Sequence, residues 1–464
     1  MTGGIARRCA WANLWLVAAL SCTIAVATFW PGHLDTDSVH QLEVARMNVE
    51  EAWPPPLLSK AWRVLDRIEP GAGGMLIFQN AMFFAGVALL VGAALGPGWA
   101  FLVPAIGFFP PILALLNTIY RDTQMGCAFA LAFGLLAWAE LRAARWPLFC
   151  APVLLLYAVG VRYNAMLAAL PAYLWWGGLA RRAWFSGRRA AAGRFAGVAL
   201  MVLSQGAVLA WFSGAIRRGA YEQVGVTEHD LAAISLDTGK NLFPETMVRR
   251  GVSLEVLRRN FRTDSADLLS WGPDASSFRP ANPGDSAMLQ RCWLAAIAAH
   301  PLAYLRHRLG MLARQLGAPR TAFFMNDMSW MSPGFVPLKV ALGVNEAPGP
   351  ADRLAMRFLM LWPGTLLFRG WIYLCIAIVA LAFPAVRAGP TFTPCRALAW
   401  SSILMAAPLL FIDPSAEFRY VWWCVIAGLL LPVTVASGWL GGKARIPATN
   451  ATSASSDAST GHHT

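Results

Sequence analysis

The chain has 464 residues, of which 57% are hydrophobic and only 14% are charged. Long apolar runs recur along most of its length, a balance that excludes a soluble globular protein. The formal net charge of +13 does not indicate a nucleic-acid partner, because the excess basic residues lie in short loops between apolar runs. The eight cysteines are scattered without a CxxC pair, which argues against a disulfide framework and a zinc site. The composition therefore predicts an all-α polytopic membrane protein.

About ten transmembrane helices are predicted from the apolar runs. Their expected bounds are 12–30, 74–95, 99–118, 124–141, 147–161, 164–179, 195–214, 366–385, 397–412 and 420–440. The first run follows two arginines as a signal peptide would, but no clean small-residue cleavage site comes after it, so we interpret it as a retained signal anchor. The short runs 147–161 and 164–179 are either two tilted helices or one broken helix. Two helices are favoured, because every Arg-rich loop then lies on the same side.

The distribution of basic loops also orients the chain in the cytoplasmic (inner) membrane, with both termini inside. The predicted parts are an N-terminal transmembrane bundle, 1–214, with a first external loop, 31–73; an external (periplasmic), mainly helical cap, 215–365; C-terminal transmembrane helices, 366–443; and a disordered cytoplasmic tail, 444–464. The loops that carry acidic residues then gather on the periplasmic side, together with the cap.

The first external loop carries two carboxylates one residue apart, Asp35 and Asp37. It is expected to form two short interfacial helices, Ser38–Val49 and Leu57–Ile68, separated by a Pro-rich segment. A carboxylate pair at a membrane surface can act as a general base or bind a divalent cation. An equally weighted alternative is that Asp37 or Ser38 caps the first of these helices. Asp35 is harder to explain as a cap, because it precedes the expected helix start by several residues.

Other charged and polar residues are expected at the same outer surface. They are Arg121 and Asp122 after the third span, Arg162 and Asn164 at the mid-chain turn, Asp413, Glu417 and Arg419 before the last span, and His300 in the cap region. The planar fork of an arginine suits phosphate oxygens. The alternatives are arginines that extend to lipid headgroups, an aromatic-flanked interface anchor at the last turn, and an ordinary amphipathic helix after His300.

The order of these motifs resembles that of bacterial GT-C-type glycosyltransferases, over almost the whole chain. The residues that carry the resemblance are Pro31, Gly32, Asp37, Ser38 and Gln41, then Trp53-Pro54-Pro55, Arg121-Asp122, Arg162 with Asn164, the stretch with Trp293, His300-Pro301, Tyr304-Leu305 and Arg308, and Glu417-Phe418-Arg419-Tyr420. Trp53 stands where members of that family usually carry His before the Pro pair.

The resemblance implies a multi-span transferase that uses a polyprenyl-phosphate-linked sugar and a glycan, lipid or protein acceptor, within the lipid bilayer. It implies that Asp37, or else Asp35, is the catalytic base or helps bind a divalent cation such as Mg²⁺ or Mn²⁺. Arg162 and Arg419 would then hold the donor phosphate. The further substrate-binding candidates are Arg121, Asp122, Asn164, Glu417 and His300.

Two other functions compete with this expectation. A transporter or flippase for lipid-linked saccharides should place charges near mid-bilayer on broken helices, often in related halves of the chain. Here the charges fall at the ends of spans and no internal repeat is evident, which favours the enzyme. The third possibility is a non-catalytic membrane protein that takes part in polysaccharide assembly. The sequence distinguishes it poorly from the enzyme.

Overall fold

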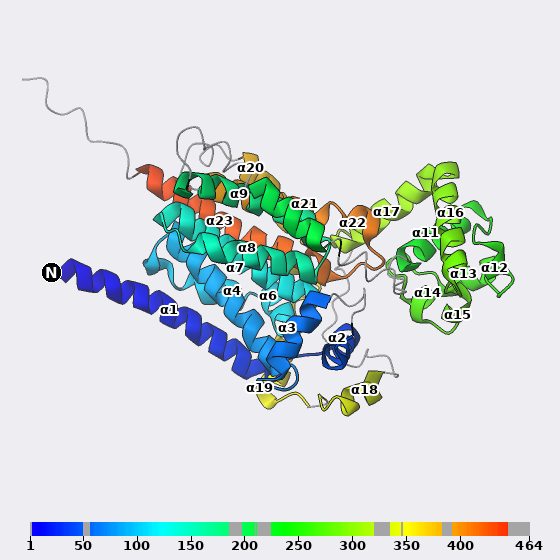
Figure 1. Ribbon diagram of the computed structural model, residues 1–464, viewed down its shortest axis with the longest axis horizontal. Coiled ribbons are helices and arrows are strands. Elements are labelled where there is room, and N and C mark those ends of the chain that lie inside the picture. The colour runs from blue at the N-terminus through cyan, green and yellow to red at the C-terminus, as the bar shows by residue number, and fades with distance from the viewer. Residues whose placement is uncertain are drawn as a thin grey trace, which may run out of the picture.

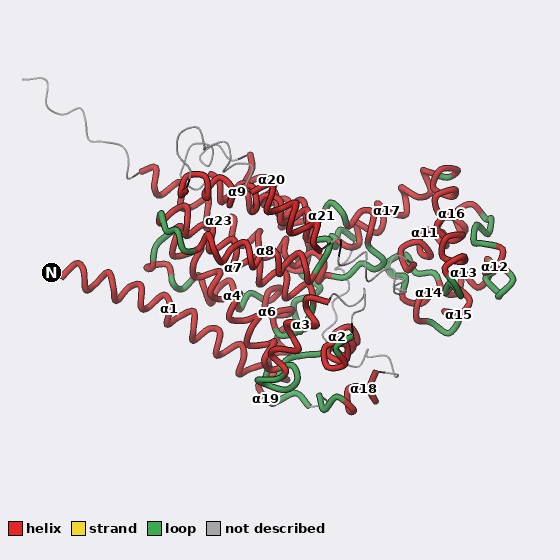
Figure 2. The backbone as a smooth tube through the Cα atoms, in the orientation of Figure 1, coloured by secondary structure: helices red, strands yellow, loops and turns green. Residues whose placement is uncertain are grey.

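The structure, a computed structural model, describes residues 2–49, 56–184, 197–208, 210, 224–319, 335–344, 347–382 and 392–443. Within these ranges the chain is helical and contains no β-strand, only two isolated bridges, as Figure 2 shows. The predicted all-α class is therefore confirmed for the part of the chain that the structure describes. The Trp53-Pro54-Pro55 motif and the C-terminal tail lie outside the described residues.

Among the residues that the structure describes, five helical segments are long and apolar enough to cross a membrane. They are Ile5–Phe29 in α1 (Thr2–Phe29), α4 (Gly73–Ala94), α7 (Arg121–Arg142), Thr393–Ile412 over α21 (Phe392–Ala406) and α22 (Leu409–Ile412), and Phe418–Gly438 over η6 (Phe418–Val421) and α23 (Trp422–Lys443). Shorter apolar helices are α8 (Pro147–Val161), Gly197–Val208 and α20 (Gly370–Ala382). α9 (Ala165–Trp184) packs beside α8 and α21. These helices make the chain a multi-pass membrane protein.

The segment predicted as one span over 99–118 is not a continuous helix. It consists of η1 (Pro97–Trp99), α5 (Leu102–Gly107) and α6 (Pro110–Leu116). Phe109 has an extended backbone because the ring of Pro110 disfavours helical geometry in the residue before it. The tandem prolines that open α6 also lack the N–H groups that would continue a helix from α5. The apolar content of this run is as expected, but its prolines break it.

α4 and α7 form the centre of the bundle, and two glycines allow their backbones to approach closely. A Cβ atom added to Gly134 would lie 2.4 Å from the carbonyl oxygen of Gly86. Small residues of this kind are typical of close helix pairs in membranes. α23 packs against the same pair, and its Trp422 and Trp423 are fully buried. The outer end of α23 is thereby held in a fixed position beside the start of α7.

α1 lies along one side of the bundle, where it contacts α4 (Figure 1). Leu14 and Ala18 are buried in this contact. Leu16, Leu20 and Ile24 on its other side are more than half exposed, at 57%, 52% and 55%. An apolar exposed face on a helix of spanning length is a face that lipid would cover.

After α1 come α2 (Thr36–Met47) and α3 (Pro56–Asp66), which pack against each other at the positions where the sequence predicts two short helices. An ion pair of 2.8 Å between Arg46 and Asp66 joins their ends. The N-terminus of α2 faces the end of the bundle where α7 and α23 begin. This arrangement brings the acidic loop to the bundle.

A helical cap lies at the end of the bundle opposite the N-terminal end of α1 (Figure 1). Its helices are α11 (Val224–Thr238), α12 (Glu245–Val248), α13 (Leu254–Asn260), α14 (Asp267–Trp271), α15 (Ala275–Phe278) and α16 (Pro283–Ala299). They share a hydrophobic core of their own, which includes Leu231, Leu257 and Phe278. The sequence did not predict this separate core. α17 (Pro301–Gln315) runs from the cap back to the bundle.

The remaining helices between α17 and α20 lie beside the bundle and not in the core of the cap. They are α18 (Phe335–Ala341), α19 (Pro350–Leu359) and η4 (Leu366–Phe368). α18 contacts α2, and α19 contacts α1 and α6. These helices therefore cover the first external loop from the side of α1.

Candidate functional site

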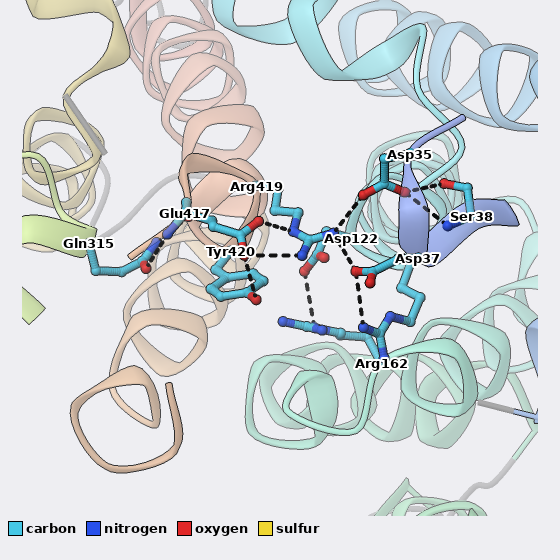
Figure 3. Close-up of polar contacts among 10 residues, drawn as sticks. Asp35, Asp37, Ser38, Asp122, Arg162, Gln315, Glu417, Arg419 and Tyr420 are labelled. Atoms are coloured by element: carbon cyan, nitrogen blue, oxygen red, sulfur yellow. Dashed lines mark hydrogen bonds and ion pairs between the residues drawn. The ribbon is translucent and has the colours of Figure 1, made fainter. Parts of the chain in front are cut away.

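The predicted polar residues gather at the cap-facing end of the bundle, in a cluster that Figure 3 shows. Four elements meet there: the N-terminus of α2, the N-terminus of α7, the C-terminus of α8 and the turn that leads into η6 and α23. We define the rim cluster as the charged residues Asp35, Asp37, Arg121, Asp122, Arg162, Asp413, Glu417 and Arg419. Apart from Asn164 and His300, it contains every candidate that the sequence nominated.

Asp35, and not Asp37 or Ser38, caps α2. One carboxylate oxygen of Asp35 accepts hydrogen bonds from the backbone N–H of Ser38 at 2.9 Å and from its hydroxyl at 2.7 Å. The expectation that Asp35 is too far from the helix to cap it was wrong, because α2 begins at Thr36. The other oxygen of Asp35 remains directed at the cluster, 3.7 Å from Arg419. A single carboxylate therefore both fixes the loop and faces the site.

Arg419 occupies the centre of the rim cluster. Its Nη1 is 2.8 Å from Asp37, and its Nε and Nη2 are 2.5 and 3.2 Å from the two oxygens of Glu417. This two-point contact with Glu417 consists of a hydrogen bond from Nη2 and an ion pair at Nε, which has no hydrogen-bond partner among the described residues. The guanidinium also lies 4.7 Å from the ring centre of Tyr120 and 5.3 Å from that of Tyr420. Arg419 is thus oriented by carboxylates within its plane and by aromatic rings.

Arg162 approaches the same place from the C-terminus of α8. Its Nε is 3.0 Å from Asp122, and its guanidinium lies 4.6 Å from the ring centre of Tyr420. Both predicted phosphate-binding arginines therefore lie against one tyrosine, although they are far apart in sequence. The expected partner Asn164 does not orient Arg162: its side-chain oxygen is buried without a hydrogen-bond partner among the described residues, and Asp122 takes that role.

Arg121 completes the cluster at the start of α7, with its Nη2 3.5 Å from Asp37. Asp37 therefore faces two arginines, since Arg419 is its other partner. Asp413, which is only 3% exposed, has one oxygen without a hydrogen-bond partner in the described chain. The cluster as a whole contains five carboxyl groups and three arginines.

These surroundings give the carboxyl groups of the cluster different pKa values. Burial raises the pKa of Asp35 to about 6, with the charge of Asp37 adding to the effect. Burial acts in the same direction on Asp37, but Arg419 and Arg121 outweigh it, so the pKa of Asp37 is lowered. Burial raises the pKa of Asp413 well above its usual range and also raises that of Glu417. Of the two adjacent carboxyl groups Asp35 and Asp37, Asp35 therefore has the pKa closer to neutral.

His300 is not part of the rim cluster. It lies at the junction of α16 and α17, and none of the described interactions of its side chain joins it to a cluster residue. Gln315 lies at the other end of α17, about 22 Å further along the helix axis. The side chain of Gln315 forms two hydrogen bonds with the backbone of Glu417, as acceptor at 2.9 Å and as donor. Sequence reasoning missed Gln315, because a lone glutamine near a helix end carries no distinguishing signal.

The cap is tied to the turn at 413–417 by further bonds. Backbone N–H groups of Ala266 and Ala416 donate to the carbonyls of Pro414 and Asp264, each at 2.8 Å. Arg308, which is fully buried, donates at 2.7 Å to the carbonyl of Asp413 and at 2.7 Å to the Asp230 carboxylate. The turn that carries Glu417 and Arg419 is therefore held by the cap as well as by the bundle.

The acidic loop does not form a ready cation site. Asp35 and Asp37 both face Arg419, and a cation between them would have to displace its guanidinium. Within the described ranges, no three His, Cys, Asp or Glu side chains gather at metal-binding distance. We therefore derive no step through a metal ion.

Comparisons of the chain with protein-family models, with curated proteins and with solved structures found no match.

Proposed function

We propose that the protein is an integral-membrane glycosyltransferase that moves a sugar from a polyprenyl-phosphate donor to an acceptor hydroxyl. The observation that carries this proposal is the convergence of Arg162 and Arg419 on Tyr420, next to Asp35 and Asp37, at the end of an apolar bundle. A lipid-linked substrate needs this combination of a bilayer-embedded scaffold and a polar site at headgroup depth.

The two arginines bind the donor phosphate in this proposal. Arg162 makes its ion pair with Asp122 through Nε, so that pair does not use its two Nη groups. The guanidinium of Arg419 already lies close to two aromatic rings, those of Tyr120 and Tyr420. The phosphodiester of the donor, whose negative charge is shared by two non-bridging oxygens, would replace part of the carboxylate contact of each arginine. Preorganised donors of this kind stabilise charge that develops on a leaving group.

Asp35 acts as the general base, and Asp37 holds Arg419 and Arg121 in position. The acceptor hydroxyl loses its proton to Asp35 while its oxygen forms the bond to the anomeric carbon. The bond between that carbon and the phosphate oxygen breaks, and the polyprenyl phosphate leaves with the bonding electrons. A pKa of about 6 suits a base that works near neutral pH. Asp37 is less suited, because its two arginine partners stabilise its charged form.

The reaction takes place on the periplasmic side of the cytoplasmic membrane in this proposal. The basic loops assign the opposite end of the bundle to the cytoplasm. The cap and the rim cluster share one end, while the first residues of α1 and the last of α23 lie at the other (Figure 1). About ten membrane crossings are needed to keep all basic loops on the cytoplasmic side. In this proposal the shorter apolar helices cross the membrane in addition to the five long ones.

The principal alternative is a flippase for lipid-linked saccharides. The position of the rim cluster at helix ends supports the enzyme, because alternating access is usually built around a site near the bilayer midplane. Assays in detergent separate the two functions. A micelle has no second leaflet, so a flippase has nothing to move there, whereas a transferase still converts donor into product.

The test is release of polyprenyl phosphate by purified protein in detergent, from a panel of synthetic polyprenyl-phosphate sugars with an envelope lipid and glycan extract as acceptor. The enzyme predicts release that depends on the extract and that is lost in the Asp35→Asn, Asp37→Asn double variant. Asp66→Asn is the matched control, since it removes an acidic residue of the same loop that pairs with Arg46 outside the cluster. Translocation in proteoliposomes without release in detergent would instead establish the flippase.

A further inference from the structure

A second polar site lies on the side of the first external loop that faces α1. A partly open cavity of about 60 Å³ lies between the end of α1, the turn before α4 and the segments around α18 and α19. One water molecule needs roughly 10–15 Å³, so the cavity has room for a small chemical group and not for a sugar. Its lining includes Trp30, His33, Glu69, Lys339 and Asp352. None of these residues belongs to the rim cluster.

Two of the lining side chains are buried and incompletely satisfied. His33 Nε2 lies 2.8 Å from Asp352 Oδ2, and the two side chains are 10% and 3% exposed. His33 Nδ1 and Asp352 Oδ1 have no hydrogen-bond partner among the described residues. Buried polar atoms without partners are rare in native proteins and mark places where a water, ion or ligand belongs.

The orphan atoms specify the chemistry of that ligand. Asp352 Oδ1 is an acceptor whatever the state of the His33 imidazole. The lining carries two carboxylates, Glu69 and Asp352, against the single ammonium group of Lys339. A ligand with N–H donors would supply the hydrogen bond that Asp352 Oδ1 lacks, and a positive charge on it would be favoured beside the two carboxylates.

The position of the cavity indicates where such a ligand comes from. Phe29 and Trp30, at the end of a helix long and apolar enough to cross the membrane, form part of the wall. The exposed apolar face of α1 leads to this point, and Trp30 itself is 41% exposed. A tryptophan at the end of a span is typical of the headgroup level. A lipid that covers α1 would therefore present its headgroup to the cavity.

We propose that this cavity binds the primary ammonium group of a phospholipid headgroup, as in phosphatidylethanolamine. The site is independent of the proposed sugar transfer. It also has a structural link to the acidic loop, because the backbone of His33 pairs with Asn117 at 2.9 Å and with Ile119 at 3.0 Å. Asp35 follows His33 by two residues, so a bound headgroup supports the loop from behind.

The experiment compares lipids that differ only in their headgroup. Delipidated full-length protein in detergent is titrated with short-chain phosphatidylethanolamine, with phosphatidylcholine of the same chains, and with free ethanolamine, and bound molecules are counted by native mass spectrometry. A choline headgroup has no N–H donor. We expect a preference of roughly tenfold for the ethanolamine lipid, the ratio that one charge-assisted hydrogen bond of about 1.4 kcal/mol produces.

Two variants keep the test decisive if one of them fails to fold. Asp352→Asn removes the charge and His33→Gln removes the ring, and either should bring the preference close to one. The control Asp285→Asn, which loses a comparable partly buried pair with Arg250 in the cap, should keep it. Equal binding of both lipids to the native protein, or a preference unchanged in Asp352→Asn and His33→Gln, would overturn the site. Free ethanolamine that binds as tightly as its lipid would overturn the lipid assignment.

Discussion

At the scale of single residues, the rim cluster gives different surroundings to two carboxylates, of which the family resemblance ranks Asp37 ahead of Asp35. Asp35 and Asp37 are one residue apart, yet one caps a helix and the other pairs with two arginines. The difference arises because successive side chains at a helix start point in different directions. A sequence motif can identify both residues as candidate bases. Only the residues that the fold brings next to each carboxyl group determine its pKa, and therefore which of the two can accept a proton near neutral pH.

The first prediction concerns pH. Asp35 must be deprotonated to act as base, and burial raises its pKa to about 6. We therefore expect kcat/KM for sugar transfer to rise with pH up to about 6 and to level off above it. Asp35→Asn should reduce the rate by two to four orders of magnitude, as the loss of a general base does (about 10²–10⁴-fold). The pH–rate profile of the wild type and the rate of the variant are the measurements.

Stability should respond to Asp35 in the opposite sense. Its pKa in the folded protein lies above the ordinary value, so the protonated form is the one that the fold favours. The stability contributed by the protonated group is fully present below the ordinary pKa near 4 and is lost as the pH rises through about 6. Asn resembles the protonated acid and is also a good helix cap. Asp35→Asn should therefore melt at the same or a higher temperature than the wild type at pH 7, and a large drop would indicate a purely structural role.

The arginines provide the second prediction. Arg419→Lys keeps a positive charge but loses the two-point contact with Glu417, and Arg162→Lys loses a planar group stacked on Tyr420. Both changes should raise the KM for the donor more than that for the acceptor, and the Ala variants should raise it further. The matched control is Arg46→Lys, which loses a similar two-point contact with Asp66 away from the cluster. Donor dependence that stays unchanged in all four variants would assign these arginines to headgroup anchoring.

At the scale of elements, sequence reasoning locates most helices but not how they are assembled. The apolar runs at α4, α7 and α23 are visible in the sequence because each buries its surface along most of its length. The run over 99–118 has the same composition, and local proline geometry divides it. The core of the cap is not predicted from the sequence, since it forms only when residues from several separate helices of the cap come together. Long-range partners such as Gln315 and Glu417 follow from tertiary structure only.

The third prediction concerns the attachment of α17 to the site. Gln315→Ala removes both hydrogen bonds to the Glu417 backbone, at a cost of about 1–2 kcal/mol in stability. The turn that carries Arg419 then loses a constraint, so we expect kcat to fall while the melting temperature changes by only a few degrees. Arg306→Ala is the control, because its pair with Asp237 is exposed on the cap. Equal effects of the two substitutions on kcat would show that α17 does not position the site.

At the scale of the whole molecule, the account requires that the cap and the basic loops lie on opposite sides of the membrane. Exposed positions for labelling are Arg145, in the loop between α7 and α8, and Ser276, in α15 of the cap. In a background without other reactive cysteines, Arg145→Cys should react with a membrane-impermeant thiol reagent only after permeabilisation, and Ser276→Cys should react in intact spheroplasts. Labelling of both residues from the same side would contradict the orientation.

The central claim is that the rim cluster carries out sugar transfer, and one rate measures it most directly. That rate is the release of polyprenyl phosphate from a polyprenyl-phosphate sugar by purified protein in detergent, with the wild type and the Asp35→Asn, Asp37→Asn double variant side by side. We expect acceptor-dependent release by the wild type and a loss of at least about 10²-fold in the double variant, with the Asp66→Asn control unaffected. Release by the double variant at the wild-type rate would contradict it.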